Sequence, residues 1–455
     1  MDFDLIIIGA GPGGYVAAER SAELGLKTAV VEKGQLGGTC LNRGCMPTKA
    51  LLHAAKQLSH MRSAGALGLI ADGVDYDFNA VQRCKNVAVD QLREGIAQGF
   101  KLKKVTHLVG TAQITAPNTV SVDGEAITAA NILIATGSAP VCPPIPGLDL
   151  PGVVTSDELL SPEGRDFRQL VIIGGGVIGM EFAAIYRALG RAVTVIEAAP
   201  RLLPAMDREI SQSLAMLLKK QGIEIALNAR VERIVDAEDG LAVIYTDKKG
   251  EECCAEADGV LAAVGRRAYF DGLFADGLCP ETAHGALVCS QHFETSIKGI
   301  FAVGDVIAGS VQLAHAASAQ GISVVHRLAG RPITTNLNYV PSCVYVDPEI
   351  ASVGMTEAQA KAAGIPVLVG KTPTLANGKS LIEHCERGFI KLVFRAEDEV
   401  LIGAQLMCAR ATDLIAAPAL AIVNGLTRRQ FLQVILPHPT FSESLTKAAE
   451  EVRAK

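Results

Sequence analysis

Long apolar runs are absent from this sequence. The apolar stretches at 5–8 and 171–173 are short and end in glycine, far below the roughly 20 residues that a membrane-spanning helix needs. The amino terminus reads Met1-Asp2-Phe3-Asp4 and lacks the basic segment that opens a secretory signal. We therefore expect a soluble protein with no membrane partner.

Basic stripes and metal-binding motifs are also lacking. Acidic and basic residues are interleaved and the net charge is −6, so the charge pattern gives no support to a nucleic-acid partner. The nine histidines show no spacing typical of metal ligands, and we expect no metal. Eleven cysteines in 455 residues do not make a disulfide scaffold of the small secreted type. This usage fits a cytoplasmic location, where a catalytic disulfide would cycle between oxidised and reduced forms.

Glycine-rich turns occur twice in one repeated pattern. In each copy an apolar strand leads into a Gly-x-Gly-x-x-Gly turn, a helix and a second strand that ends in an acid. The first turn spans 9–14 and its acid is Glu32, whereas the second spans 174–179 and its acid is Glu197. The glycines permit a tight turn, close approach of a pyrophosphate and close helix packing, and the helix N-terminus attracts phosphate. The repeat predicts two βαβ dinucleotide-binding domains.

The acid of the second copy also bears on the choice of nucleotide. Glu197 would accept hydrogen bonds from ribose hydroxyls and would repel a 2′-phosphate. The next basic residue is Arg201. The sequence therefore favours NAD over NADP at this site.

Two cysteines stand close together between the two turns. Cys40 and Cys45 belong to the run 37–49, which is dense in glycine and proline. On an undistorted α-helix, Cα atoms five positions apart lie roughly 8–9 Å from each other, beyond the ~7 Å limit for a disulfide. Gly44 and Pro47, together with the earlier glycines, permit the irregular backbone that a bridge needs. We predict a redox-active dithiol, with two buried structural thiols as the alternative.

These motifs resemble those of the class I pyridine nucleotide-disulfide oxidoreductases, and within that family those of the dihydrolipoamide dehydrogenases. The resemblance covers essentially the whole chain. Beyond the two fingerprints and the dithiol run, the matching segments are 135–137, Gly304-Asp305, 346–354 and 438–443.

The resemblance implies an α/β fold. It consists of two Rossmann-like dinucleotide-binding domains, with the NAD domain inserted in the FAD domain, and a C-terminal α+β dimerisation domain. The expected boundaries are 1–147 for the FAD-binding domain, 148–270 for the NAD-binding domain, 271–337 for a central domain that completes the FAD site, and 338–455 for the C-terminal dimerisation domain. We expect this last domain to end in a long helix near Ser442–Arg453.

The resemblance also implies catalytic roles. Cys40 would be the thiol that exchanges with substrate, and Cys45 the thiolate that faces the flavin. His438 would be the base, oriented by Glu443, and would act across the interface of a homodimer. Exchange requires a thiolate attacker, and an imidazole has the right pKa to take the proton. From the residues alone, a surface histidine in a proline-rich turn is an equal alternative.

The cofactors implied by the resemblance are FAD and NAD, with an ion pair between Lys49 and Glu181 beside the flavin. The expected FAD residues are Gly9, Gly11, Gly14, Glu32, Lys49, Gly110, Gly137 and Asp305. The expected NAD residues are Gly174, Gly176, Gly179, Glu181, Glu197, Val231 and Gly265.

The implied activity is the NAD-dependent oxidation of protein-bound dihydrolipoamide to lipoamide. The implied partner is a lipoylated carrier protein or an acyltransferase subunit, as in 2-oxoacid dehydrogenase or glycine-cleavage systems. Two alternatives stay open. One is an NAD(P)H-dependent reductase of a low-molecular-weight disulfide, and the other is a flavin-binding assembly subunit without turnover.

Two positions depart from the pattern of the dihydrolipoamide dehydrogenases. Leu436 stands where an outer histidine is usual before the His-Pro-Thr segment. After Gly265, Arg266 and Arg267, the usual Pro-Asn pair is replaced by Ala268-Tyr269, which we expect on the nicotinamide side of the site.

Overall fold

The computed structural model describes residues 1–385 and 387–454. The amino-terminal part builds a parallel sheet in the order β3-β2-β1-β6, which β19 extends beside β6. An antiparallel extension through β5 and β4 follows on β6. The strands are β1 (Phe3–Ile8), β2 (Thr28–Glu32), β3 (Thr106–Val109), β4 (Ala112–Ala116), β5 (Thr119–Val122), β6 (Glu125–Ile134) and β19 (Ile300–Ala302). Leu5, Ile6 and Ile7 are fully buried, as expected for a strand covered on both faces.

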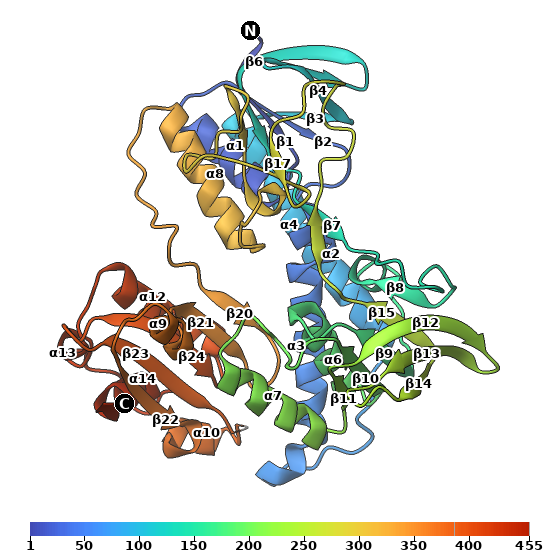
Figure 1. Ribbon diagram of the computed structural model, residues 1–455, viewed down its shortest axis with the longest axis vertical. Coiled ribbons are helices and arrows are strands. Elements are labelled where there is room, and N and C mark those ends of the chain that lie inside the picture. The colour runs from blue at the N-terminus through green and yellow to red at the C-terminus, as the bar shows by residue number, and fades with distance from the viewer. Residues whose placement is uncertain (386, 455) are drawn as a thin grey trace.

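Helices from both ends of this part pack against the sheet and against the second unit (Figure 1). They are α1 (Pro12–Glu23), α2 (Gly38–Arg43), α3 (Cys45–Arg62), α4 (Phe78–Lys103) and α8 (Ala314–Leu328), with 3₁₀ turns η1 (Ala64–Leu67) and η2 (Gly304–Val306). Helices α1 and α8 lie side by side although about 300 residues separate them. A Cβ atom on Gly321 would lie 2.5 Å from the carbonyl oxygen of Gly13. Glycine therefore allows the two backbones to approach closely.

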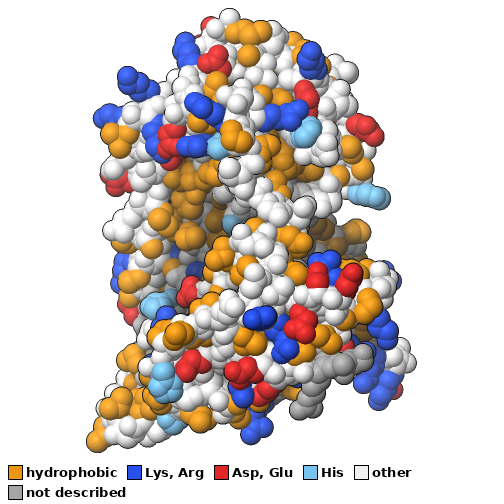
Figure 2. Space-filling model, turned by 90° about the vertical axis from the view of Figure 1, so that its left-hand side faces the viewer, with side chains coloured by type: hydrophobic (Ala, Val, Ile, Leu, Met, Phe, Trp, Pro, Cys, Tyr) orange, Lys and Arg blue, Asp and Glu red, His pale blue; other side chains and the backbone are white. Residues whose placement is uncertain are grey.

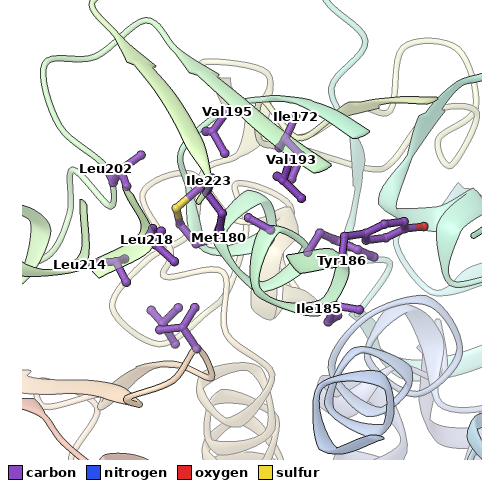
Figure 3. Packing of buried hydrophobic residues seen from close by; sticks show 14 of the residues in the cluster. Ile172, Met180, Ile185, Tyr186, Val193, Val195, Leu202, Leu214, Leu218 and Ile223 are labelled. Atoms are coloured by element: carbon purple, nitrogen blue, oxygen red, sulfur yellow. The ribbon is translucent and has the colours of Figure 1, made fainter. Parts of the chain in front are cut away.

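A second parallel sheet follows in the order β11-β10-β9-β15-β8. Its strands are β8 (Val153–Thr155), β9 (Gln169–Ile173), β10 (Ala192–Glu197), β11 (Glu224–Leu227) and β15 (Gly259–Ala262), and its helices are α5 (Ser156–Leu159), α6 (Val177–Ala188) and α7 (Arg208–Lys220). The antiparallel strands β12 (Arg230–Ala237), β13 (Gly240–Thr246) and β14 (Glu252–Ala257) are attached to it. Figure 3 shows the core between α6, the second sheet and α7. The residues labelled there are Ile172, Met180, Ile185, Tyr186, Val193, Val195, Leu202, Leu214, Leu218 and Ile223.

The chain passes between the two sheets through a pair of short strands. Strand β7 (Ser138–Pro140) leaves the first sheet, and β16 (Arg266–Ala268) returns antiparallel beside it. The second sheet is therefore an insertion into the first unit, as predicted. The small hairpin of β17 (Thr282–Ala283) and β18 (Ala286–Leu287) precedes β19.

The last part of the chain is a six-stranded antiparallel sheet covered by short helices. Its strands are β20 (Ser342–Val344), β21 (Ile350–Gly354), β22 (Val367–Pro373), β23 (Phe389–Arg395), β24 (Leu401–Met407) and β25 (Val452–Ala454). Its helices are α9 (Glu357–Ala362), α10 (Gly378–Ile382), α11 (Ala411–Leu414), α12 (Ala416–Val423), α13 (Arg428–Phe431) and α14 (Glu443–Glu450), with η3 (Thr374–Ala376).

The predicted fold class is confirmed, with two parallel-sheet units and an α+β unit. The exact domain boundaries remain predictions. The expected long helix near Ser442–Arg453 was wrong at its end, because α14 stops at Glu450 and the chain turns into β25, which pairs with β22. Across 1–385 and 387–454, no helix has the length and apolarity that a bilayer crossing requires.

A buried ion cluster joins the second unit to the carboxy-terminal sheet. Lys391 on β23 contacts Asp207 at 2.8 Å and Glu209 at 3.3 Å, and its side chain is only 6% exposed. Lys371 on β22 also pairs with Glu209. Asp207 caps the N-terminus of α7. The cluster therefore fixes this helix against two strands of the other unit.

We expect Lys391→Ala to lower the free energy of unfolding by about 3 kcal/mol, because it leaves the buried carboxylate of Asp207 without its cation. Urea denaturation of the two proteins measures the difference. Lys447→Ala serves as the matched control, since its pair with Glu450 is exposed and should matter by less than ~1 kcal/mol. Equal losses in both variants would contradict the assignment.

Candidate active site

One cavity of about 1830 Å³ brings most of the predicted site residues together. Its lining comes from the first sheet, the second sheet and the segment around β20. The predicted residues that line it are Gly9, Gly11, Glu32, Cys40, Cys45, Lys49, Gly137, Gly174, Gly176, Glu181, Glu197, Val231, Gly265 and Asp305. Residues from both glycine-rich turns and both cysteines thus face a single space.

Five predicted residues do not line this cavity: Gly14, Gly110, Gly179, His438 and Glu443. Gly14 and Gly179 are the third glycines of their turns, which face the strand rather than a ligand. Gly110 follows β3 with a φ of +158°, and a Cβ there would lie 2.5 Å from a carboxylate oxygen of Asp123. Its predicted role at FAD stays a prediction.

The first glycine-rich turn is crowded by its own backbone. A Cβ on Gly14 would lie 1.9 Å from the carbonyl oxygen of Gly9, and a Cβ on Gly9 would lie 2.5 Å from that of Ala135. Gly9 also has a φ of +98°, which favours glycine. Helix α1 starts directly after Gly11, which caps it without a side chain. Backbone N–H groups are therefore open to a pyrophosphate, and the site fits FAD.

The second turn has the same construction. A Cβ on Gly179 would lie 2.1 Å from the carbonyl oxygen of Gly174, and a Cβ on Gly174 would lie 2.4 Å from that of Ala263. Gly176 caps α6 without a side chain. This turn can therefore hold the pyrophosphate of a second dinucleotide, and the site fits NAD.

The two acids brace their turns in the same way. The carboxylate of Glu32 accepts hydrogen bonds from the backbone N–H groups of Ala10 and Gly34, both at 2.8 Å. The carboxylate of Glu197 accepts one from the N–H of Gly175. Because each carboxylate oxygen has two acceptor sites, both acids keep capacity for ribose hydroxyls in the cavity.

The dithiol lies on the irregular backbone that its spacing predicted. Helix α2 ends at Arg43, and α3 begins at Cys45 after a break at Gly44. A Cβ on Gly44 would lie 2.9 Å from the carbonyl oxygen of Thr39, so the break has no room for a side chain. Cys40 projects from α2. Both thiols are free in this structure.

The surroundings of the two thiols shift their pKa values in opposite directions. A hydrogen bond from the Cys40 thiol and the nearby charge of Lys49 lower the pKa of Cys45 to about 7. The same hydrogen bond, together with burial, raises the pKa of Cys40 well above its usual range. As the pH rises through neutrality, Cys45 therefore loses its proton first, while Cys40 keeps its own.

The expected ion pair between Lys49 and Glu181 is present. The Lys49 ammonium donates to the two carboxylate oxygens of Glu181 at 3.0 and 2.8 Å. It also lies 4.5 Å from the ring centre of Tyr345, whose backbone N–H donates to Glu181 at 3.0 Å. The pair joins α3 to α6 and holds a positive charge close to Cys45.

Sequence reasoning missed a polar chain that supports Asp305. The hydroxyl of Ser138 donates to Asp305 at 2.6 Å, and the guanidinium of Arg266 donates to that hydroxyl at 2.9 Å. Arg266 also pairs with Asp157 at 3.4 Å. Burial raises the pKa of Asp305, whereas Ser138 and Arg266 oppose this shift. Only the position of Arg266 beside Gly265 could have signalled its role.

His438 and Glu443 form the expected pair away from the cavity. The Nδ1 atom of His438 lies 2.9 Å from a carboxylate oxygen of Glu443, and the histidine side chain is 81% exposed. The backbone N–H of Thr440 and the hydrogen bond with His438 lower the pKa of Glu443. An oriented, exposed imidazole therefore lies outside the lining of the cavity that holds the dithiol.

Tyr269 contacts the segment that follows the first glycine-rich unit's acid, and its expected place on the nicotinamide side stays a prediction. Its hydroxyl accepts a hydrogen bond of 2.7 Å from Lys33, which directly follows Glu32 at the end of β2. Tyr269 therefore reaches the end of β2 while lining the cavity that both glycine-rich turns share. Among the described residues, no group of three or more metal-ligating side chains is found.

Comparisons with known proteins agree with this geometry. Residues 3–321 match the family model described as pyridine nucleotide-disulphide oxidoreductase, and residues 340–449 match the dimerisation domain of that family. The chain is 40% identical to a dihydrolipoyl dehydrogenase of Bacillus subtilis (strain 168), over 98% of this chain and 97% of that protein. It is 38% identical to one from Geobacillus stearothermophilus, over 99% and 96%.

A solved structure is also similar over nearly the full length. The HOCl-induced flavoprotein disulfide reductase RclA from Escherichia coli superposes with a TM-score of 0.87 at 30% identity. The match covers 98% of this chain and 99% of that chain.

We expect Lys49→Met to raise the pKa of Cys45 from about 7 towards its ordinary value of about 8.5, because the change removes a stabilising positive charge. The pH dependence of thiolate absorbance in the reduced protein measures this shift. Lys49→Arg, which keeps the charge, and Lys56→Met, which lies farther along α3, are the controls. An unchanged titration in Lys49→Met would exclude Lys49 as a cause.

Proposed function

Because this chain belongs to the pyridine nucleotide-disulphide oxidoreductase family, we propose that it is a dihydrolipoyl dehydrogenase. It oxidises protein-bound dihydrolipoamide to lipoamide and uses NAD as the acceptor. The observation that supports this most strongly is the single cavity in which the Cys40–Cys45 dithiol faces both dinucleotide turns. FAD, when bound, supplies the two-electron link between the thiols and the nicotinamide.

The dithiol and His438 carry the exchange with substrate. In the oxidised protein a substrate thiolate attacks Cys40, the bond between the two cysteine sulfurs breaks, and Cys45 leaves as a thiolate. The low pKa of Cys45 makes it a good leaving group. The second substrate thiol then attacks the substrate sulfur that is bonded to Cys40. Lipoamide forms, and Cys40 is released. His438 accepts one of the two substrate protons, and Cys40 keeps the other.

The remaining site residues hold and position the nucleotides. We assign these roles to the FAD residues and the NAD residues that the resemblance implies. Glu197 selects NAD through its carboxylate. The hydrogen bond from the N–H of Gly175 to the carboxylate of Glu197 supports this assignment, since it fixes the carboxylate at the end of β10.

A homodimer completes the site. Residues 340–449 match a dimerisation domain, and several large apolar side chains of this part are exposed, with Ile435 at 95% and Leu420 at 66%. Figure 2 shows a hollow with hydrophobic side chains on the face that includes this part. The exposed His438 is then supplied to the dithiol of the partner subunit. The protein works in the cytoplasm on a lipoylated carrier protein or acyltransferase subunit.

A substrate panel tests the assignment. We expect NAD-dependent oxidation of dihydrolipoamide to exceed, by at least about a hundredfold in kcat/KM, the reduction of glutathione disulfide or coenzyme A disulfide with NADH or NADPH. The reason is that Glu197 disfavours a 2′-phosphate and the dithiol is placed for exchange with a dithiol substrate. A preference for a small disulfide would identify the protein as a disulfide reductase. Bound FAD without any turnover would indicate an assembly subunit.

We expect His438→Gln to lower the oxidation of dihydrolipoamide by roughly 10²–10⁴-fold, since general-base catalysis contributes this much. His60→Gln, at another exposed histidine, is the control. Near-normal turnover of His438→Gln would remove this residue from the mechanism.

Mixed dimers show whether the base acts across the interface. After Cys40→Ser and His438→Gln proteins are unfolded, mixed and refolded together, about a quarter of wild-type activity should return, because half of the dimers are mixed and each carries one intact site. No recovery would place His438 and Cys40 of one subunit at the same site.

A further inference from the structure

Lys33 and Tyr269 form a contact that the proposed reaction does not use. The ammonium of Lys33 donates to the hydroxyl of Tyr269 at 2.7 Å and lies 4.3 Å from the centre of its ring. The contact therefore combines a hydrogen bond with a cation–π interaction. The two residues are far apart in the sequence, and they belong to different segments of the cavity wall.

Both partners stand at the FAD side of the cavity. Lys33 follows Glu32, the acid of the first glycine-rich turn, and both side chains line the cavity together with Tyr269. The backbone N–H of Tyr269 donates to the carbonyl of Gly137 at 3.0 Å. Tyr269 is thus anchored at its backbone to one predicted FAD segment and through its hydroxyl to another.

The Lys33 ammonium interacts with Tyr269 rather than with an acidic side chain. Lys33 acts on Asp271, but the pKa of Asp271 is lowered first by Arg267, and Lys33 is the smallest of its causes. Arg267 contacts Asp271 at 2.7 and 3.2 Å. Within the described part of the chain, no carboxylate lies within ion-pair distance of Lys33. Lys33 is exposed at the rim of the cavity, and its ammonium donates a hydrogen bond to the phenol hydroxyl.

We propose that Lys33 and Tyr269 act as a clasp that closes the rim of the FAD site beside Glu32 and slows the release of FAD. The clasp joins the loop after β2 to the segment after β16 at the wall of the cavity beside Glu32. Tyr269 supplies both the hydroxyl and the ring that hold the Lys33 ammonium. The inference rests on the proposed function only in requiring that FAD occupies this cavity.

The rate of FAD release tests the clasp. The holoenzyme is diluted with an excess of a flavin-trapping apoprotein, and the loss of bound FAD is followed by absorbance. We expect Tyr269→Ala to speed release about tenfold, which corresponds to ~1.4 kcal/mol. Tyr269→Phe keeps the ring and loses only the hydroxyl, so release should be about threefold faster.

A double variant and a control decide whether the pair acts as a unit. Lys33→Ala combined with Tyr269→Ala should release FAD no faster than the faster single variant, because one contact cannot be lost twice. Lys27→Ala is the matched control. It breaks a cation–π pair with Phe3, 5.3 Å from the ring centre, in the same unit but outside the cavity, and it should leave the rate unchanged.

The outcomes are distinct. Unchanged release from Tyr269→Ala, additive effects in the double variant, or equal acceleration by Lys27→Ala would each overturn the clasp. Failure of the proposed function would look different, because the wild-type protein would then retain no FAD or would not oxidise dihydrolipoamide at any rate of FAD release.

Discussion

The whole site depends on one close approach between two backbones. A Cβ on Gly38 would lie 2.6 Å from the Cα of Gly11, and the N–H of Gly37 donates to the carbonyl of Ala10 at 2.8 Å. This contact presses the start of the dithiol segment onto the first glycine-rich turn, which is possible only because both sides lack side chains. The thiols are thereby placed at the same cavity as the dinucleotide turns, and their chemistry follows from that position.

Electrostatics then decides what each thiol does. A hydrogen bond from Cys40 and the charge of Lys49 lower the pKa of Cys45 to about 7, while Cys40 holds its proton. Lys49 is itself fixed by Glu181, which is almost completely buried. A buried carboxylate needs such a partner, so the ion pair serves both the packing of α3 on α6 and the reactivity of the dithiol.

Much of the fold and the site could be predicted from the sequence because the relevant interactions are local. The glycine-rich turns, the acids at their strand ends and the broken helix at Gly44 are each encoded within a few dozen residues. The missed features join distant segments. Arg266 meets Ser138, and Tyr269 meets Lys33, contacts that no periodicity or spacing reveals. The end of α14 was missed for the same reason, since pairing with β22 overrides helix propensity in β25.

The exposure of His438 has a consequence for the protein at low concentration. A lone subunit would keep its thiols, its nucleotide cavity and the contacts that retain the flavin, yet its imidazole would face only water. Under the role proposed for His438 at the partner's dithiol, dilution below the point of subunit dissociation would therefore stop substrate turnover while the yellow colour persisted. Electron transfer between the nicotinamide and the dithiol would outlast the capacity to exchange with substrate, so the two half-reactions would respond differently to subunit concentration.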